Sequence, residues 1–296
     1  MILITAAHGN QGKLLVPKLV AAGFSVRAVV RSERSADALR AAGVAEVIAG
    51  DISEPEIQAR AIAGVEKVYH VGPTANPNER GMGLALIDAA QAAGVKHFVF
   101  SSVLHAITTE LVQHEIKRDV EEHLLSSRLE FTILQPANYM LPLKLKPAFE
   151  DGVFRLSWSL DRRQSLVDLG DVTDVALEVL GASERHAGAT YELVGPGRYT
   201  AHDLVAVISR VVGRPIAAEE IDADTYFNAW FPNADRGQFQ HQLRVLRSIS
   251  SRYSQHDFLG NPNVLTWLLG RPPTTFETFV QAQHAAFVAR GAPAAA

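Results

Sequence analysis

The fold is decided by the amino-terminal stretch Ile2-Leu3-Ile4-Thr5-Ala6-Ala7-His8-Gly9-Asn10-Gln11-Gly12, which runs on into Lys13-Leu14-Leu15-Val16. Residues 2–5 form an apolar β-type run, residues 6–12 a glycine-bearing turn, and residues 13–16 the start of a helical pattern. This order brings the free N–H groups of a helix N-terminus to the carboxyl end of a strand, where they favour negative charge. Many glycine turns are simply tight turns, but this position between strand and helix predicts a pyrophosphate site.

Short apolar strands recur along the first half of the chain, each followed by a helical pattern. Strands are expected at 25–30, 46–49, 67–71, 96–101 and 131–134, and helices at 11–22, 35–42, 54–63, 78–93 and 110–127. Ala-Gly pairs at 22–23, 42–43 and 93–94 are typical of helix ends just before a strand. Continuous apolar strands that alternate with helices predict a doubly wound parallel sheet with helices on both faces, a Rossmann-type α/β fold.

Size and composition narrow the classes of function. The chain has 296 residues, 47% of them hydrophobic and 20% charged, and its formal net charge is −4. No excess of Lys and Arg is available for nucleic acid or an anionic membrane. There is no cysteine, the eleven histidines lack ligand spacing, and no apolar run reaches the roughly 20 residues of a membrane span. We expect a cytoplasmic monomer or homodimer without a metal, acting on a small molecule.

The residues that follow the strands are the candidate ligand contacts, because ligands of such sheets gather at the carboxyl ends of the strands. The turn supplies Ala6, His8, Gly9, Asn10, Gln11 and Gly12. Gly72 follows the fourth strand, and Ser102 the fifth. Asp51, after the third strand, is expected beside the adenine, or alternatively as the cap of the next helix.

The second strand ends at a basic turn that bears on the choice of nucleotide. An NAD site usually has a carboxylate here, whereas this chain has Arg31 and, about one helical turn later, Arg34. A guanidinium suits a 2′-phosphate, and one charge-assisted contact would favour NADP over NAD by roughly tenfold or more. The alternative is a solvated basic turn. We expect NADP, with NAD possible.

A series of motifs resembles the NmrA-like branch of the atypical short-chain dehydrogenases/reductases. The matching segments are the glycine turn, Val26–Arg31, Gly50-Asp51, His97–Ser102, Lys117, Val120–Glu122, Phe131–Pro136, Asp171–Ala176, Tyr191–Pro196 and Gly270–Glu277. The resemblance implies a Rossmann domain for NAD(P) and a smaller C-terminal region closing over the nicotinamide. Family members include quinone reductases, isoflavone-reductase-like enzymes and NADP-sensing regulators. The chain departs from the pattern at Ala6, where the family has glycine.

The same resemblance identifies Lys117 as the residue that holds the nicotinamide ribose. Related enzymes carry a proton-donating tyrosine four residues before this lysine, but that position is Gln113 here. His114 lies on the same helix face as Lys117, and His114, Ser102 and Lys117 are the candidate catalytic residues. The alternatives are that His114 packs or caps, that Lys117 pairs with Glu121 at i,i+4, and that Ser102 only satisfies backbone groups.

The second half of the chain is less regular. Strands are expected at 166–169 and 190–194, and helices at 171–180 and 200–212, so that residues 166–194 return to the Rossmann domain of residues 1–136. Residues 137–165 and 195–296 would form a smaller α+β substrate-binding region. Thr274 and Glu277 have capping-box spacing. Tyr139 and Trp230 are candidate substrate contacts, the latter in an aromatic segment that forms either a pocket wall or a small core.

Together these features predict an NADP-dependent reductase that passes hydride to a small quinone, carbonyl or conjugated aromatic substrate. The alternative is a non-catalytic NADP(H)-sensing protein that acts through a protein partner. The missing tyrosine favours the sensor, whereas Lys117 and the aromatic segment favour the enzyme.

Overall fold

The computed structural model describes residues 1–73, 76–231, 237 and 239–291, and the chain divides into two compact units. Unit 1 comprises residues 1–109, 113–136 and 169–193. Unit 2 comprises the described residues of 110–112, 137–168 and 194–296. No helix among the described residues is long and apolar enough to cross a membrane.

Unit 1 is built on a seven-stranded parallel sheet with the order β10-β6-β5-β4-β1-β2-β3. Its strands are β1 (Ile2–Ile4), β2 (Val26–Val30), β3 (Glu46–Ala49), β4 (Lys67–Val71), β5 (His97–Ser101), β6 (Phe131–Pro136) and β10 (Ala189–Leu193). Its helices are α1 (Gly12–Ala21), α2 (Glu33–Ala41), α3 (Pro55–Ile62), α4 (Glu79–Ala92), α5 (Val112–Leu125), α7 (Leu169–Gly181) and α8 (Ser183–His186). The predicted doubly wound α/β fold is confirmed.

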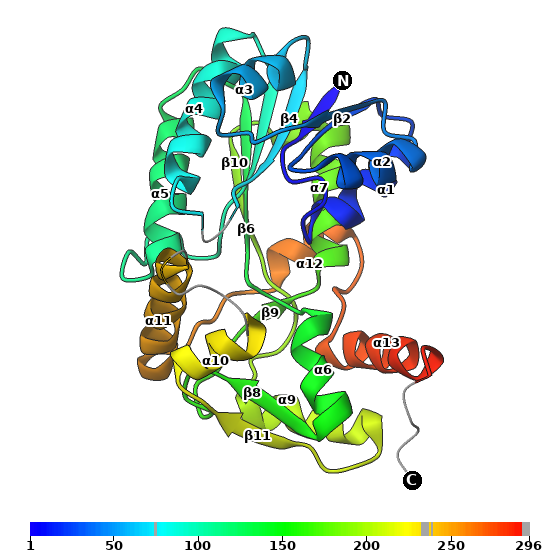
Figure 1. Ribbon diagram of the computed structural model, residues 1–296, viewed down its shortest axis with the longest axis vertical. Coiled ribbons are helices and arrows are strands. Elements are labelled where there is room, and N and C mark those ends of the chain that lie inside the picture. The colour runs from blue at the N-terminus through cyan, green and yellow to red at the C-terminus, as the bar shows by residue number, and fades with distance from the viewer. Residues whose placement is uncertain (74–75, 232–236, 238, 292–296) are drawn as a thin grey trace. The chain divides into compact units, whose positions relative to one another are not determined.

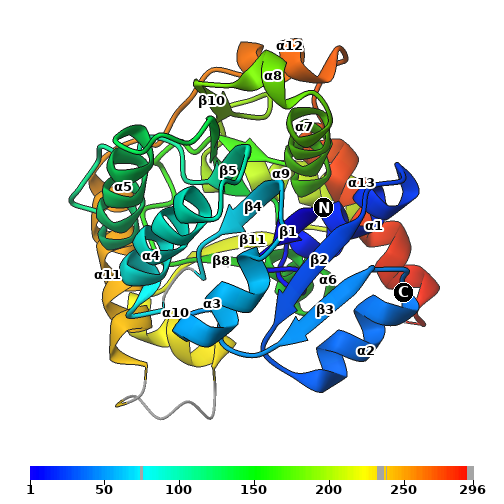
Figure 2. The same cartoon turned by 90° about the horizontal axis from the view of Figure 1, so that it is seen from above.

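The helices cover both faces of this sheet. Helices α3, α4 and α5 lie on one face, and α1 and α7 pack together on the other (Figures 1 and 2). The strands are apolar because both faces are covered, and the five residues of β2 and of β5 are all buried. Leu3, Val68, Phe98 and Phe100 belong to the main apolar core.

Unit 2 combines helices with two small two-stranded sheets, one pairing β8 with β11 and the other pairing β7 with β9. Its elements are β7 (Asn138–Tyr139), α6 (Pro142–Asp151), β8 (Val153–Leu156), β9 (Leu166–Val167), α9 (Ala201–Val212), β11 (Ala217–Glu220), α10 (Ala223–Trp230), α11 (Gln240–Gln255), α12 (Asn263–Leu269) and α13 (Phe276–Ala289). Helix α13 packs on α9 and α6.

Two local expectations need correction. The strand expected at residues 166–169 ends at Val167, because Leu169 already begins α7, whose first turn carries Asp171. Helix α13 is capped by Thr275, whose side chain accepts a hydrogen bond from the Thr278 N–H. The cap expected at Thr274 was therefore one residue too early. Helix α9, by contrast, has the full capping box between Thr200 and Asp203 and ends at the left-handed Gly213.

Candidate functional site

The strand order reverses between β1 and β4, which makes this place the topological switch point of the sheet. The chain moves outward from β1 through β2 to β3, then crosses back to β4 on the other side of β1. Helices on the two sides of this point diverge, so that ligands of such sheets bind at the carboxyl ends of these two strands. The glycine turn follows β1, and Gly72 follows β4. The two segments therefore meet where a nucleotide site is expected.

Gly12 allows α1 to begin directly against the turn. A Cβ atom at this position would lie 2.2 Å from the carbonyl oxygen of Ala6 and 2.6 Å from backbone atoms of Ala7. No side chain larger than hydrogen fits there without moving the backbone. At Gly9 the same atom would lie 3.1 Å from the Ala6 oxygen, which already accepts the Gly9 N–H at 2.9 Å. Position 12 is thus more restrictive than position 9.

The N-terminus of α1 presents backbone groups rather than a capping side chain. Gln11 occupies the N-cap position in a helical conformation, and no side chain caps the helix. The Gln11 amide is turned inward: its Nε2 donates to the Ser101 hydroxyl at 2.8 Å, and its Oε1 accepts from the Tyr69 hydroxyl. The side chain therefore ties the turn to β4 and β5. His8 and Asn10 are exposed.

Two arginines and one carboxylate lie at the tips of β2 and β3. Arg31 and Arg34 are exposed, and among the described residues neither guanidinium forms a hydrogen bond or ion pair. The pKa of Asp51 is held below its usual value by the backbone N–H of Ser53, by the Ser53 hydroxyl and by the charge of Arg31. Asp51 thus caps the short turn before α3, and Arg31 is close enough to act on it. This arrangement can receive an additional phosphate.

Lys117 forms a buried ion pair that the sequence did not reveal. Its Nζ lies 2.7 Å from Oε1 of Glu79, and the two side chains are 5% and 2% exposed. Glu121, the alternative partner that the i,i+4 spacing suggested, instead accepts a hydrogen bond from Gln135 at 2.8 Å. Burial raises the pKa of Glu121. Glu79 was missed because the first residue of a helix is ordinarily exposed and nothing in its neighbourhood marks it as buried.

Gly72 provides the room for this ion pair. A Cβ atom on Gly72 would lie 2.5 Å from Oε1 of Glu79 and 2.9 Å from Nζ of Lys117. The ammonium also lies 5.3 Å from the centroid of the Phe100 ring. The backbone after β4 therefore runs directly past a charged pair.

The two candidate proton donors are both buried. His114 is fully buried, and its Nδ1 lies 3.0 Å from the carbonyl oxygen of His105, which means that Nδ1 carries the proton donated to that oxygen. Ser102 donates its backbone N–H to Leu134 at 2.8 Å. Both residues thus make backbone or side-chain contacts within unit 1.

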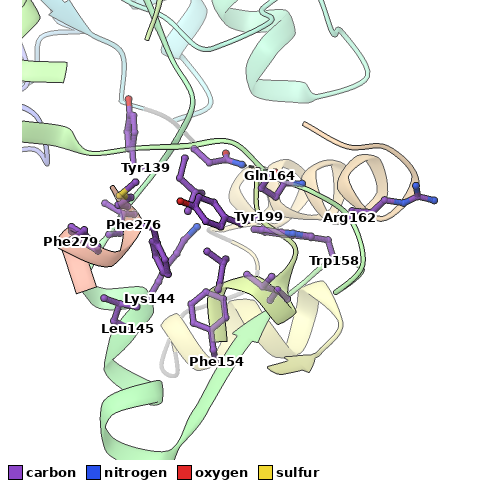
Figure 3. Close-up of a pocket in the computed structure, with 17 residues that line it drawn as sticks. Tyr139, Lys144, Leu145, Phe154, Trp158, Arg162, Gln164, Tyr199, Phe276 and Phe279 are labelled. Atoms are coloured by element: carbon purple, nitrogen blue, oxygen red, sulfur yellow. Dashed lines mark hydrogen bonds between the residues drawn. The ribbon is translucent and has the colours of Figure 1, made fainter. Parts of the chain in front are cut away.

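Of the two candidate substrate contacts, Tyr139 lies in β7 and lines a cavity in unit 2 (Figure 3). Trp230 is the last residue of α10, and its side chain lies outside the described part of the structure. Three rings of the nearby aromatic segment, Phe227, Phe231 and Phe239, pack on one another at centroid distances of 5.0 to 6.1 Å. None of the three lines this cavity. The cavity walls include Lys144, Trp158 and Tyr199, none of which was expected from the sequence to contact a ligand.

Comparisons with known proteins agree with this geometry. Residues 1–256 match the model of the NmrA-like family. The NAD(P)H azoreductase of Xenophilus azovorans is 30% identical over 97% of this chain and 99% of its own length. The NADPH-dependent quinone oxidoreductase of Escherichia coli, solved with NADPH, superposes with a TM-score of 0.81 at 26% identity over 96% of this chain and all of its own. The photosystem II assembly factor Ycf39 of Guillardia theta is 27% identical over 90% and 91% of the two chains.

Proposed function

The chain belongs to the NmrA-like family, and we propose that it is an NADPH-dependent reductase of a small quinone, carbonyl or conjugated aromatic substrate. One observation carries this proposal: the uncapped N-terminus of α1 begins against the glycine turn at the switch point of the sheet, with exposed guanidinium groups at Arg31, directly after β2, and at Arg34, in the first turn of α2. Relatives over the whole chain are an NAD(P)H azoreductase and an NADPH-dependent quinone oxidoreductase.

In this proposal, different residues of unit 1 bind different parts of the nucleotide. Ala6, His8, Gly9, Asn10, Gln11 and Gly12 offer backbone N–H groups and close approach to the pyrophosphate. Arg31 and Arg34 bind the 2′-phosphate, and Asp51 lies beside the adenine. Gly72 and Lys117 contact the nicotinamide ribose. We assign the cofactor to unit 1 and the substrate to unit 2.

The cofactor would supply the hydride. The protein would position the cofactor and assist the transfer of a proton to the substrate. Lys117 is held in place by Glu79, and its ammonium would keep further N–H donors for a ribose hydroxyl. His114 holds its Nδ1 proton against the His105 carbonyl, which leaves Nε2 as the ring atom for an incoming proton. The buried Ser102 hydroxyl, which has no hydrogen-bond partner among the described residues, is the second candidate. Either group could assist the proton without the tyrosine of related enzymes.

A regulatory function without catalysis is the second candidate. Position 113 carries a buried glutamine instead of a phenol, and a photosystem II assembly factor is among the relatives. In this case the protein would distinguish the redox forms of the nucleotide and act through a protein partner.

One experiment separates the two candidates. NADPH absorbance is followed with the purified protein and a panel of quinones, enones and aldehydes, while the affinities for NADPH and NADP⁺ are measured by calorimetry. Turnover that Lys117→Met removes, with nucleotide binding retained, supports the reductase. Absence of turnover across the panel, together with a clear affinity difference between the two redox forms, supports the regulator instead.

A further inference from the structure

A cavity lies entirely within unit 2 (Figure 3). Its walls come from the segment joining β7 to α6, from β8 and the chain after it, and from the first residues of α9 and α13. Rings of Phe154, Trp158, Tyr199 and Phe276 face it together with aliphatic side chains. The walls therefore suit a flat, apolar group.

Lys144 is the charged group of this cavity. Figure 3 shows its side chain reaching from α6 toward the rings of Tyr199 and Trp158, and its Nζ lies 5.6 Å from the Trp158 ring centroid. No Asp or Glu lines the cavity, and the ammonium has no ion pair among the described residues. Burial lowers the pKa of Lys144 to about 8, which leaves the side chain mostly charged at neutral pH. The other basic residue of the walls, Arg162, points its guanidinium away (Figure 3) and has its Nε 3.3 Å from the Ser254 carbonyl oxygen.

Two further donors of the walls are also without acceptors. Nε1 of Trp158 and Nε2 of Gln164 are buried and form no hydrogen bond within the described structure. The orientation of the Gln164 amide is set by its neighbours: Tyr253 donates to Oδ1 of Asn138, and Nδ2 of Asn138 donates to Oε1 of Gln164 at 2.8 Å. Nε2 of Gln164 is thus the amide atom that has no hydrogen-bond partner among the described residues. Buried donors without partners are costly, and two of them beside the partly buried Lys144 ammonium call for an acceptor.

We propose that this cavity binds a planar aromatic anion, with its charged oxygens on Lys144 and its ring between the aromatic walls. An arene carboxylate or a phenolate combines the two required properties: it is flat, and it supplies the acceptors that the walls lack. The proposal requires neither NADPH nor turnover, because every group that carries it belongs to unit 2.

The competing explanation is that Lys144 only completes the fold through its contact with the Trp158 ring. A purely structural lysine would make binding of any flat ligand depend on the shape of the ligand and not on its charge. The two explanations therefore differ in one measurable property, the preference of the cavity for a charged over a neutral ligand of the same shape.

The test uses naphthalene-2-carboxylate and its neutral isostere naphthalene-2-carboxamide, titrated calorimetrically into the purified 296-residue protein. We expect the carboxylate to bind at least about tenfold more tightly than the carboxamide, as a charge-assisted contact implies. Lys144→Met should abolish this preference, and Lys144→Arg should retain it.

Lys146→Met is the matched control, because Lys146 lies on the same helix but is exposed and 3.7 Å from Glu150. It should change neither affinity more than twofold. Equal binding of the two probes to the wild-type protein, binding of neither, or a preference that survives Lys144→Met would each overturn the proposal. A failure of the reductase assay would leave this result unaffected.

Discussion

Lys117 in unit 1 is buried and Lys144 in unit 2 is partly buried, but only Lys117 has a carboxylate partner. Glu79 lies 2.7 Å from Lys117, whereas the ammonium of Lys144 faces aromatic rings. A buried charge that is paired also stabilises the fold, because removal of its partner leaves an uncompensated ion. A partly buried charge without a partner contributes less to the fold and is available to a ligand. The two lysines thus mark two kinds of site in one chain.

The largest effect is expected when the pair in unit 1 is broken. Glu79→Gln leaves the buried Lys117 without a counter-ion and should lower the free energy of unfolding by about 3–5 kcal/mol. Urea denaturation measures the change. Glu121→Gln is the control, since Glu121 is not the direct partner of Lys117. Equal losses for the two variants, or no loss for Glu79→Gln, would show that the pair is not what secures Lys117.

Within the glycine turn, substitution of Gly12 should be tolerated less well than substitution of Gly9. Gly12→Ala places a methyl group 2.2 Å from the Ala6 oxygen and should cost about 1–3 kcal/mol of stability together with nucleotide affinity. Gly9→Ala, with its nearest contact at 3.1 Å, should cost clearly less. Denaturation and calorimetry on both variants give the ranking, and the reverse order would contradict the packing described for α1.

Acid should weaken unit 1 through two buried histidines. Burial lowers the pKa of His70 to about 3 and that of His97 to about 4, so both stay neutral in the folded state while they protonate in the unfolded chain below about pH 6.5. Stability is therefore full above pH 6.5 and falls as the pH drops, by about 1 kcal/mol per histidine between pH 6 and 5. His97→Gln should halve this slope, and the exposed His256→Gln should leave it unchanged. A slope unaffected by His97→Gln would contradict the assignment.

The basic turn after β2 should set the choice of nucleotide. Arg31→Ala removes one contact with the 2′-phosphate and should weaken NADPH binding about tenfold, or about 1.4 kcal/mol, without changing NADH binding. Arg60→Ala, an arginine of α3, is the control. An unchanged preference for NADPH over NADH in Arg31→Ala would show that Arg31 does not contact the 2′-phosphate.

The smallest effect on stability is expected at Lys144. Because its ammonium has no carboxylate partner, Lys144→Met replaces a poorly solvated charge by an apolar chain of similar length and should alter the free energy of unfolding by less than about 1 kcal/mol, or raise it. Thermal and urea unfolding measure the difference from Glu79→Gln. A loss as large as that of Glu79→Gln would mean that Lys144 is also part of the fold.

The same contrast explains how much of the molecule the sequence predicts. The glycine turn is one continuous segment, and the strands at 46–49 and 67–71 were predicted at their observed bounds, because a buried parallel sheet leaves apolar runs and helix ends leave glycines. Lys117 was selected as a candidate from the family resemblance. Its partner was not, because Glu79 reaches it through the fold rather than through helical spacing.

The cavity of unit 2 had almost no sequence signal. Its walls come from several segments far apart in the chain, and a lysine before Leu145 in an apolar stretch looks like an ordinary surface residue. The aromatic segment around Phe227 and Phe231 was the more conspicuous feature, yet its rings pack on one another. Clustered residues reveal a local core, whereas a cavity assembled from distant segments requires the structure.

The central claim is that the glycine turn and Arg31 bind NADP(H), and calorimetric titration of the folded protein with NADPH and NADH tests it most directly. The account predicts saturable binding of both nucleotides, tighter for NADPH, with the difference removed by Arg31→Ala. Absence of heat with every nicotinamide nucleotide, from a protein shown to be folded, would contradict it.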